Sequence, residues 1–468
     1  MAHYYDELLK LCGFEDEQID EERHRIEKAF QKLELGPEDM ERADGWVREN
    51  HQIELAGVRG LLRLWILELI DLVLARDEGK KIVYFGYPSI TPGPGMAIKA
   101  AAPEQIFSAC PDAILCHTMG QIFNKINPIL EAGEENGLPP GHALCSLLQV
   151  RVGGMAKGII PVPDLAFGSS YFCDMGSKTD EMLRERYGHR GLYVDGSMDS
   201  AWGEYPDFLP ERVEFFGAQL NKVVGVVKEV LGVEVTSEAW EKVAGITRSF
   251  FHSLGQLSLL MMADPTPVST VVTGLALNLI GGCTGRAMIE GPPVMAILAE
   301  EARQRVDKGI GIVEKGTPRV LIGVNNFSDP RITHMMEEAG IAPIAIAFVT
   351  PPKLATRKAP AGTYTTQGEV RAERELRDGR WHSSYAGVAR GPETLMALNP
   401  DGVISSYPFS CRPVAVASHL YKLVAEKTGI PHLSLEIDLY DSRNYSAEVL
   451  RTKVETFAEL LRARKAAN

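Results

Sequence analysis

The first 78 residues carry apolar side chains at three- and four-residue spacing among charged ones, which is the pattern of amphipathic helices. The pattern is clearest over residues 18–33 and 37–75. It changes at residues 80–86, where a short apolar run ends in glycine and is followed by a loop rich in proline and glycine, residues 87–95. We therefore expect a helical N-terminal segment, residues 1–78, and then a buried strand with a loop at its carboxyl end.

Beyond this loop, strand-like runs alternate with helical stretches, as they do in proteins built on parallel sheets. The alternation predicts a first α/β domain, residues 79–200. Its further candidate strands are residues 113–116, 165–172 and 191–194, with a helix over residues 180–187.

The chain becomes helical again and later returns to the alternating pattern. Long amphipathic stretches at residues 210–263 and 294–308 predict a helical middle region, residues 201–315. A second α/β domain, residues 316–468, is predicted from apolar runs at residues 317–324, 342–349, 402–405 and 432–437.

The last part of the chain is expected to contain a long loop and a final helix. The charged stretch 351–380 is expected to be a loop, and residues 446–462 a closing helix. The predicted fold class is α/β, with two Rossmann- or flavodoxin-like parallel-sheet domains and helical N-terminal and middle segments.

Composition and charge argue against several classes of binding partner. The 468 residues include 49 Lys and Arg against 62 Asp and Glu, a net charge of −13. This balance argues against nucleic-acid partners and against anionic membrane surfaces, since both attract basic proteins. The apolar stretches 61–75 and 271–282 are too short or too interrupted to span a bilayer. The N-terminus lacks the pattern of a secretory signal, so we expect a cytoplasmic protein.

Several common catalytic motifs are missing from the sequence. It contains no G-x-x-x-x-G-K-[ST] phosphate loop, no H-E-x-x-H and no G-x-S-x-G. Gly93-Pro94-Gly95 follows a predicted strand, but the third glycine of a dinucleotide fingerprint is absent, so we interpret it as a turn.

The residues best suited by type to carry a functional site are the cysteines. The chain has seven of them, spread over its whole length. This odd and small number indicates that the cysteines stay reduced and do not form disulfides. Cys110, Cys116 and His117 together resemble half of a zinc site. Their spacing matches no zinc motif, and core thiols are the favoured interpretation. Cys12 and Cys283 are also interpreted as core residues.

Cys145, Cys173 and Cys411 each lie just beyond a predicted strand or at the boundary of an element. Ligand sites of α/β sheets collect at the carboxyl ends of strands, so the two halves could share a metal site there. Three thiolates on a 4Fe–4S cluster leave one iron open to act as a Lewis acid. Spacing alone leaves two interpretations open: a shared metal site, or unrelated core cysteines.

Several segments from about residue 80 to the end resemble one known family. They are Leu144-Cys145-Ser146, Pro163-Asp164-Leu165, Phe172-Cys173-Asp174, the run from Val403 to Cys411, Gly429 to Glu436, and Asp438-x-x-Asp441-x-Arg443. The chain resembles the 2-hydroxyacyl-CoA dehydratase / benzoyl-CoA reductase family, which comprises iron–sulfur subunits of strict anaerobes. The family's adjacent cysteine pairs of the double-cubane type are missing here.

The resemblance implies two α/β domains and one 4Fe–4S cluster per subunit, held by Cys145, Cys173 and Cys411. Pro103-Glu104 is similar to a family segment whose carboxylate lies near the open iron. This implies an acid/base role for Glu104, with a helix-capping surface residue as the alternative.

The implied activity is that of a lyase that removes water from an (R)-2-hydroxyacyl-CoA through a ketyl radical. The implied partners are a homologous second subunit and a separate ATP-hydrolysing iron–sulfur activator protein, and the implied substrate is an acyl-CoA thioester. Two alternatives stay open: a subunit of an ATP-dependent benzoyl-CoA reductase, and a non-catalytic electron-relay partner.

Overall fold

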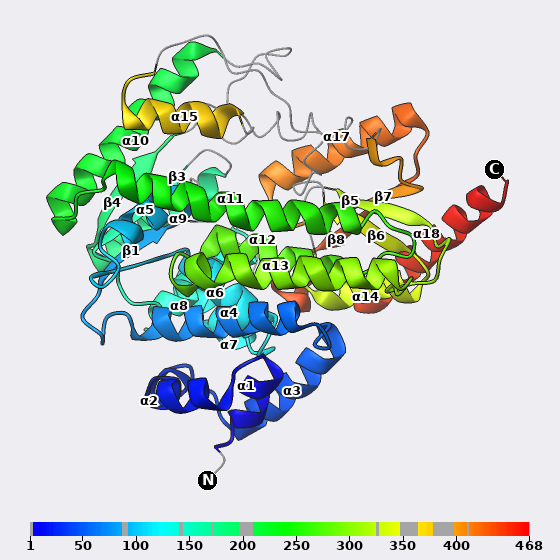
Figure 1. Cartoon of the computed structure of the whole chain (residues 1–468), viewed down its shortest axis with the longest axis horizontal. Coiled ribbons are helices and arrows are strands. Elements are labelled where there is room, and N and C mark those ends of the chain that lie inside the picture. The colour runs from blue at the N-terminus through cyan, green and yellow to red at the C-terminus, as the bar shows by residue number, and fades with distance from the viewer. Residues whose placement is uncertain are drawn as a thin grey trace.

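The computed structural model describes residues 3–86, 92–139, 144–169, 173–195, 209–323, 327–346, 364–377, 397–409 and 411–467. Over these residues the chain forms two four-stranded parallel sheets embedded in helices (Figure 1). The predicted α/β class with two parallel sheets is therefore confirmed.

The first sheet consists of β1 (Lys81–Phe85), β2 (Ile106–Ala109), β3 (Leu165–Ser169) and β4 (Arg190–Val194). Its strand order is β2-β1-β3-β4. The helices that connect these strands are α5 (Pro92–Ala101), α6 (Pro111–Leu115), α7 (Asn127–Glu135), α8 (Ser146–Ala156) and α9 (Asp174–Tyr187), with one π-helical turn at Cys116–Gly120.

The second sheet repeats this topology. It consists of β5 (Arg319–Gly323), β6 (Ala342–Ile346), β7 (Gly402–Pro408) and β8 (His432–Ile437), in the order β6-β5-β7-β8. Its helices are α14 (Pro330–Glu338), α15 (Gln367–Arg377), α17 (Arg412–Thr428) and α18 (Ala447–Ala467), with a 3-10 turn at Ser442–Asn444. In each sheet the strand order reverses between the first and third strands, where ligands of doubly wound folds bind.

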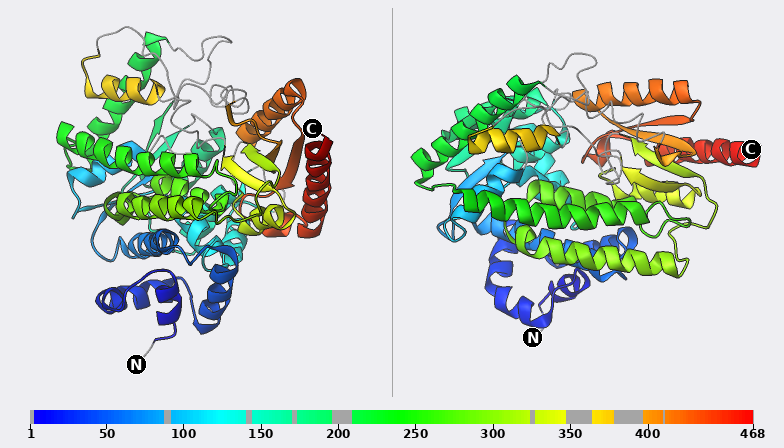
Figure 2. Two further views of the ribbon diagram at one scale, coloured as in Figure 1. Left: turned by 45° about the vertical axis from the view of Figure 1, so that its right-hand side comes forward. Right: turned by 45° about the horizontal axis from the view of Figure 1, so that its top comes forward.

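In the described part of the chain, eight further helices surround and join the sheets. They are α1 (Asp6–Leu11), α2 (Asp16–Lys32), α3 (Pro37–Asn50), α4 (Ala56–Leu74), α10 (Pro210–Leu231), α11 (Ser237–Leu260), α12 (Thr270–Gly282) and α13 (Arg286–Asp307). Helices α11, α13 and α4 run side by side, and α1 to α3 lie beyond α4 (Figures 1 and 2).

Two of these helices are apolar almost all round, and each is correspondingly buried. Helix α4 packs against α13, and α12 contacts α5 and α6 of the first half as well as β6 and α14 of the second half. The middle helices therefore connect the two sheets. No helix in the described part of the chain is both long and apolar enough to cross a membrane.

Three details of the predicted elements were wrong. Residues 113–116 are helical, within α6 and the π-helical turn, because Pro111 and Asp112 begin a helix before the short apolar run. Residues 92–95 belong to α5 rather than to a turn, and residues 367–377 form α15 rather than a loop.

Other parts of the predicted elements lie outside the described residues, namely 87–91, 170–172, 201–208, 324, 347–349, 351–363 and 378–380. The domain boundaries stay a prediction.

Candidate functional site

Cys145, Cys173 and Cys411 share one structural position, since each is the residue that immediately precedes a helix. Cys145 caps α8, Cys173 caps α9 and Cys411 caps α17, and all three are partly exposed. Cys173 follows β3 and Cys411 follows β7. Helix α8 leads back toward the start of β3, so its first residue also lies on the carboxyl side of the first sheet.

The three thiols lie within electrostatic reach of one another. Burial raises the pKa of Cys145 to about 12, and the neighbouring Cys411 and Cys173 raise that pKa further. Burial raises the pKa of Cys411 to about 11, and Cys173 adds to this effect. The structure thus brings Cys145 and Cys173 of the first half close to Cys411 of the second half.

The helix ends oppose this effect. The backbone N–H of Leu148 lowers the pKa of Cys145, and that of Val414 lowers the pKa of Cys411. The N-terminus of a helix carries partial positive charge, which favours a thiolate or another anion. The helix N-termini therefore offset part of the effect of burial on the thiols of Cys145 and Cys411.

A single metal ion and an iron–sulfur cluster require different arrangements of these three thiols. Among the described residues, no three His, Cys, Asp or Glu side chains converge closely enough to hold one metal ion. A cubane cluster has a different requirement, because each thiolate binds a different iron. Three thiols on neighbouring helix ends fit that requirement, and binding of the metal would deprotonate them.

A hydrogen-bonded junction beside Cys145 joins the two halves. The Ser146 hydroxyl donates to Oδ1 of Asp438, which follows β8, and accepts the backbone N–H of Tyr440 at 2.9 Å. Asp438 Oδ2 accepts from Nδ2 of Asn444 at 3.0 Å. The N-terminus of α8 is therefore tied directly to the second sheet.

Arg443 extends this junction. Its guanidinium donates to Asp441 and, at 2.8 Å, to Glu134 on α7. The loop after β8 is thus attached to two helices of the first half.

A buried ionic triad lies below the two cysteines of the first half. Arg151 on α8 donates to Asp112 Oδ2 at 2.6 Å and also to Asp180 Oδ1 on α9. The triad was not predicted from the sequence. The available signal was a single arginine inside an otherwise apolar helix, since a buried charge of this kind needs ionic partners.

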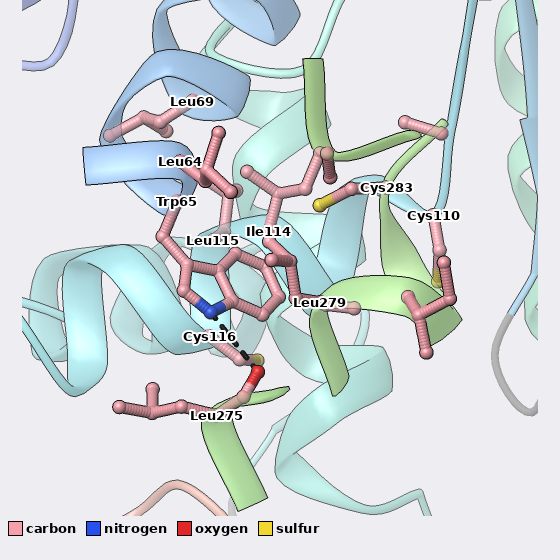
Figure 3. Close-up of a cluster of buried hydrophobic side chains, with 14 of the residues drawn as sticks. Leu64, Trp65, Leu69, Cys110, Ile114, Leu115, Cys116, Leu275, Leu279 and Cys283 are labelled. Atoms are coloured by element: carbon pink, nitrogen blue, oxygen red, sulfur yellow. Dashed lines mark hydrogen bonds between the residues drawn. The ribbon is translucent and has the colours of Figure 1, made fainter. Parts of the chain in front are cut away.

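Cys110, Cys116 and Cys283 are buried in the core, among Trp65, Leu115, Leu279 and other apolar side chains (Figure 3). Burial raises the pKa of each of the three thiols well above its usual value. Their predicted burial is confirmed. Cys110 has a further role, because its thiol donates a hydrogen bond to Asp112 at 2.9 Å.

His117 belongs to the same core. Its ring stacks on Trp65 with a centroid distance of 4.6 Å, and its Nδ1 pairs with the carbonyl oxygen of Ala113 at 2.8 Å. Burial lowers the pKa of His117 to about 4. This packed imidazole gives no support to a zinc site with Cys110 and Cys116.

Glu104 lies away from the three cysteines. It precedes β2 and is therefore at the amino edge of the sheet, whereas the cysteines are at the carboxyl edges. Its side chain is 92% exposed, and its Oε2 lies 4.0 Å from Nζ of Lys80. The structure agrees with the surface alternative for this residue, so Glu104 is given no part in the proposed site.

Comparison with known families gives a match over most of the chain. The family model described as 2-hydroxyglutaryl-CoA dehydratase, D-component, matches residues 100–461, about three quarters of the chain. The matched range contains all three cysteines at the helix ends and both four-stranded sheets except β1. A search of curated proteins finds no match.

Proposed function

The chain belongs to the 2-hydroxyglutaryl-CoA dehydratase D-component family, and from this premise we propose a specific role for it. It is the iron–sulfur subunit of an ATP-activated radical dehydratase that removes water from an (R)-2-hydroxyacyl-CoA through a ketyl radical. One observation carries the proposal: cysteines from both halves cap three helices at the carboxyl edges of the sheets.

In this proposal Cys145, Cys173 and Cys411 hold a 4Fe–4S cluster. When bound, the cluster supplies electron-transfer and Lewis-acid chemistry. The helix N-termini behind the cysteines favour the negative charge of the thiolates and of an anionic ligand.

In this proposal both halves of the chain contribute ligands to the site. Ser146 and Asp438 fix the start of α8 against the second half, next to Cys145. Cys411 comes from that second half. The junction therefore fixes the position of Cys145 relative to the half that carries Cys411.

The family description names one component of a dehydratase, so the chain functions with at least one partner component. We propose that its partners are a homologous second subunit and a separate ATP-hydrolysing iron–sulfur activator protein. The proposed substrate is an acyl-CoA thioester, and the proposed location is the cytoplasm. The net charge of −13 gives no support to a nucleic-acid or membrane partner.

The first experiment is anaerobic purification of the chain, followed by reconstitution and counting of iron and sulfide. We expect a brown protein with about four iron and four sulfide per chain. A chain that stays colourless and free of iron after reconstitution would disprove the cluster.

The second experiment tests the reaction. The reconstituted complex is incubated with the activator, ATP, a strong reductant and a panel of acyl-CoA thioesters. Dehydration of a 2-hydroxyacyl-CoA with catalytic use of electrons supports the proposal. Stoichiometric consumption of electrons with benzoyl-CoA would instead identify a ring reductase. A cluster-loaded chain that leaves every thioester unchanged would point to an electron-relay subunit.

A further inference from the structure

Helices α8 and α9 begin at two of the three proposed ligands and are joined to each other by a buried ionic triad. Arg151 lies six residues after Cys145, and Asp180 lies seven residues after Cys173. The Arg151 guanidinium contacts Asp180 on α9 and Asp112 on α6. The triad therefore connects the two ligand-bearing helices less than two turns below the edge at which the thiols lie.

The triad is almost completely removed from solvent. The side chains of Arg151 and Asp112 are 5% and 0% exposed, and that of Asp180 is 11% exposed. Burial raises the pKa of Asp180 to about 6, although the neighbouring Arg151 lowers it. The second carboxylate oxygen of Asp180 is buried and lacks a hydrogen-bond partner among the described residues.

Buried ionic groups of this kind are in general weak evidence for a gain in stability. The cost of desolvating buried ions can exceed their attraction, and apolar side chains of similar volume often serve stability equally well. Geometric precision is a different matter, because the planar guanidinium binds its carboxylates in fixed directions. Arg151 contacts Asp112 through both Nε and a terminal nitrogen, at 3.2 and 2.6 Å, and reaches Asp180 through the other terminal nitrogen.

The triad also packs closely against the backbone of the first sheet. A Cβ atom at Gly86, just after β1, would lie 2.9 Å from Asp180 Oδ2 and 3.0 Å from a terminal nitrogen of Arg151. A Cβ atom at Gly168 in β3 would lie 2.8 Å from the same Asp180 oxygen. The triad thus rests on the two strands between which the strand order reverses, and glycine is needed for this close approach.

From these contacts we infer that Arg151 is a positioning residue, which sets the separation of the N-termini of α8 and α9 and thereby the spacing of the Cys145 and Cys173 thiols. The inference rests on the proposed function, because the spacing matters when both thiols bind one cluster. Groups that orient metal ligands in this way typically change metal affinity by about 10- to 100-fold when they are replaced.

The test compares three variants with the unchanged chain. Arg151→Lys keeps the charge but loses the planar fork. The neutral combination D112N, R151Q and D180N removes all three charges, so that no unpaired buried ion can prevent folding. Glu68→Gln is the matched control, since Glu68 is also fully buried but joins α4 to α13 and is no part of the triad or of the three proposed ligands.

The first readout needs no cluster. In a Cys411→Ser background, nitroxide spin labels are attached to Cys145 and Cys173, and the dipolar broadening between them is measured without metal. The other four cysteines are buried and should stay unlabelled. We expect a broader distribution of label separations in both triad variants and an unchanged distribution in the control. Equal distributions in all proteins would overturn the inference.

The second readout is the rate at which a chelator removes iron from the reconstituted chain, in which Cys411 is intact. We expect release to be about 10- to 100-fold faster in the triad variants than in the Glu68→Gln control. Equal release from triad variants and control would overturn the inference. Failure of the unchanged chain to take up iron would instead refute the proposed function, and the spin-label result would still decide whether Arg151 sets the spacing.

Discussion

Cys173 and Cys411 occupy the same position in the two halves of the protein. Each lies beyond the third strand of a four-stranded parallel sheet and caps the helix that follows. Both helices also end at a left-handed glycine, Gly188 with φ 70° and Gly429 with φ 71°. The candidate site therefore combines two equivalent sheet edges, with Cys145 as the additional ligand from the first half.

Replacing Cys411 is the most direct test of the shared site. Cys411 is the only proposed ligand from the second half, so Cys411→Ala would leave two thiolates from the first half. We expect the variant to lose most of its iron and its charge-transfer absorbance when it is purified and reconstituted without oxygen. Iron per chain and the visible spectrum are the measurements.

The matched control for this experiment is Cys116→Ala, because Cys116 is fully buried and makes core contacts. Cys110 is a poorer control, since its thiol is hydrogen-bonded to Asp112 of the buried triad. If Cys411→Ala kept its iron while Cys116→Ala lost it, the ligand assignment would be wrong.

Glu104→Gln tests whether the exposed carboxylate takes part in the reaction. Its side chain is 92% exposed and lies at the amino edge of the first sheet. We expect kcat and KM of the reconstituted complex to stay within about twofold of the unchanged values, since surface substitutions of this kind rarely affect a distant site. A loss of kcat by more than about tenfold, with iron content unchanged, would restore the acid/base role that the resemblance implied.

Ser146→Ala tests the junction between the halves. The hydroxyl of Ser146 donates to the carboxylate of Asp438 and accepts the N–H of Tyr440. Hydrogen bonds to charged groups contribute about 1.5–3 kcal/mol, so we expect a clear drop in Tm together with faster loss of iron. Thermal unfolding and chelator kinetics are the measurements.

Ser258→Ala is the control for this variant. Ser258 is equally buried, but its hydroxyl donates only to Leu254 of its own helix, at 2.8 Å. We expect it to lower Tm less and to leave iron release unchanged. Identical behaviour of the two serine variants would show that the junction has no special role.

The repeated sheet architecture was within reach of sequence analysis, because short apolar runs bounded by glycine and proline mark buried parallel strands. Every strand of the second sheet begins inside or at the start of its predicted run. The strand at residues 106–109 was missed in favour of residues 113–116. Both runs are short and apolar, and periodicity cannot distinguish a buried strand from a buried helical turn at this length.

The candidate site was only partly predictable. The position of the three cysteines at element boundaries was predictable, and their role as ligands, which the family resemblance implied, stays a prediction. The triad of Asp112, Arg151 and Asp180 did not, because its members are far apart in the sequence and meet only through tertiary packing. Glu104 shows the opposite situation, because a similar local segment implied an acid/base role, whereas its exposed place at the amino edge gives that role no support.

The carboxyl of Glu68 on α4 is fully buried. Its Oε1 accepts the backbone N–H of Ala287 at the start of α13, at 2.9 Å, and its Oε2 is buried without a partner among the described residues. Burial raises the pKa of Glu68 from its usual 4.5 to about 8, and the neighbouring Asp71 adds to this effect. The folded protein therefore binds this proton more tightly than the unfolded chain does.

The sign of the pH dependence follows from this difference. The stabilising contribution of the protonated carboxyl is fully present below about pH 4.5 and is lost as the pH rises through about 8. Glutamine resembles the neutral acid and cannot ionise. We therefore expect Glu68→Gln to match the unchanged chain near pH 5 and to be more stable by a few kcal/mol near pH 9, since each pKa unit corresponds to about 1.4 kcal/mol.

Thermal unfolding from pH 5 to 9 measures this difference, with Glu459→Gln on α18 as an exposed control. The difference in Tm between Glu68→Gln and the unchanged chain should grow with pH, whereas the Glu459→Gln difference should stay constant. A Glu68→Gln difference that does not vary with pH would mean that the Glu68 carboxyl titrates alike in the folded and unfolded chain. In that case the Glu68 carboxylate would be ionised in the folded protein at neutral pH. It would then join α4 to α13 as a negative charge at the N-terminus of α13.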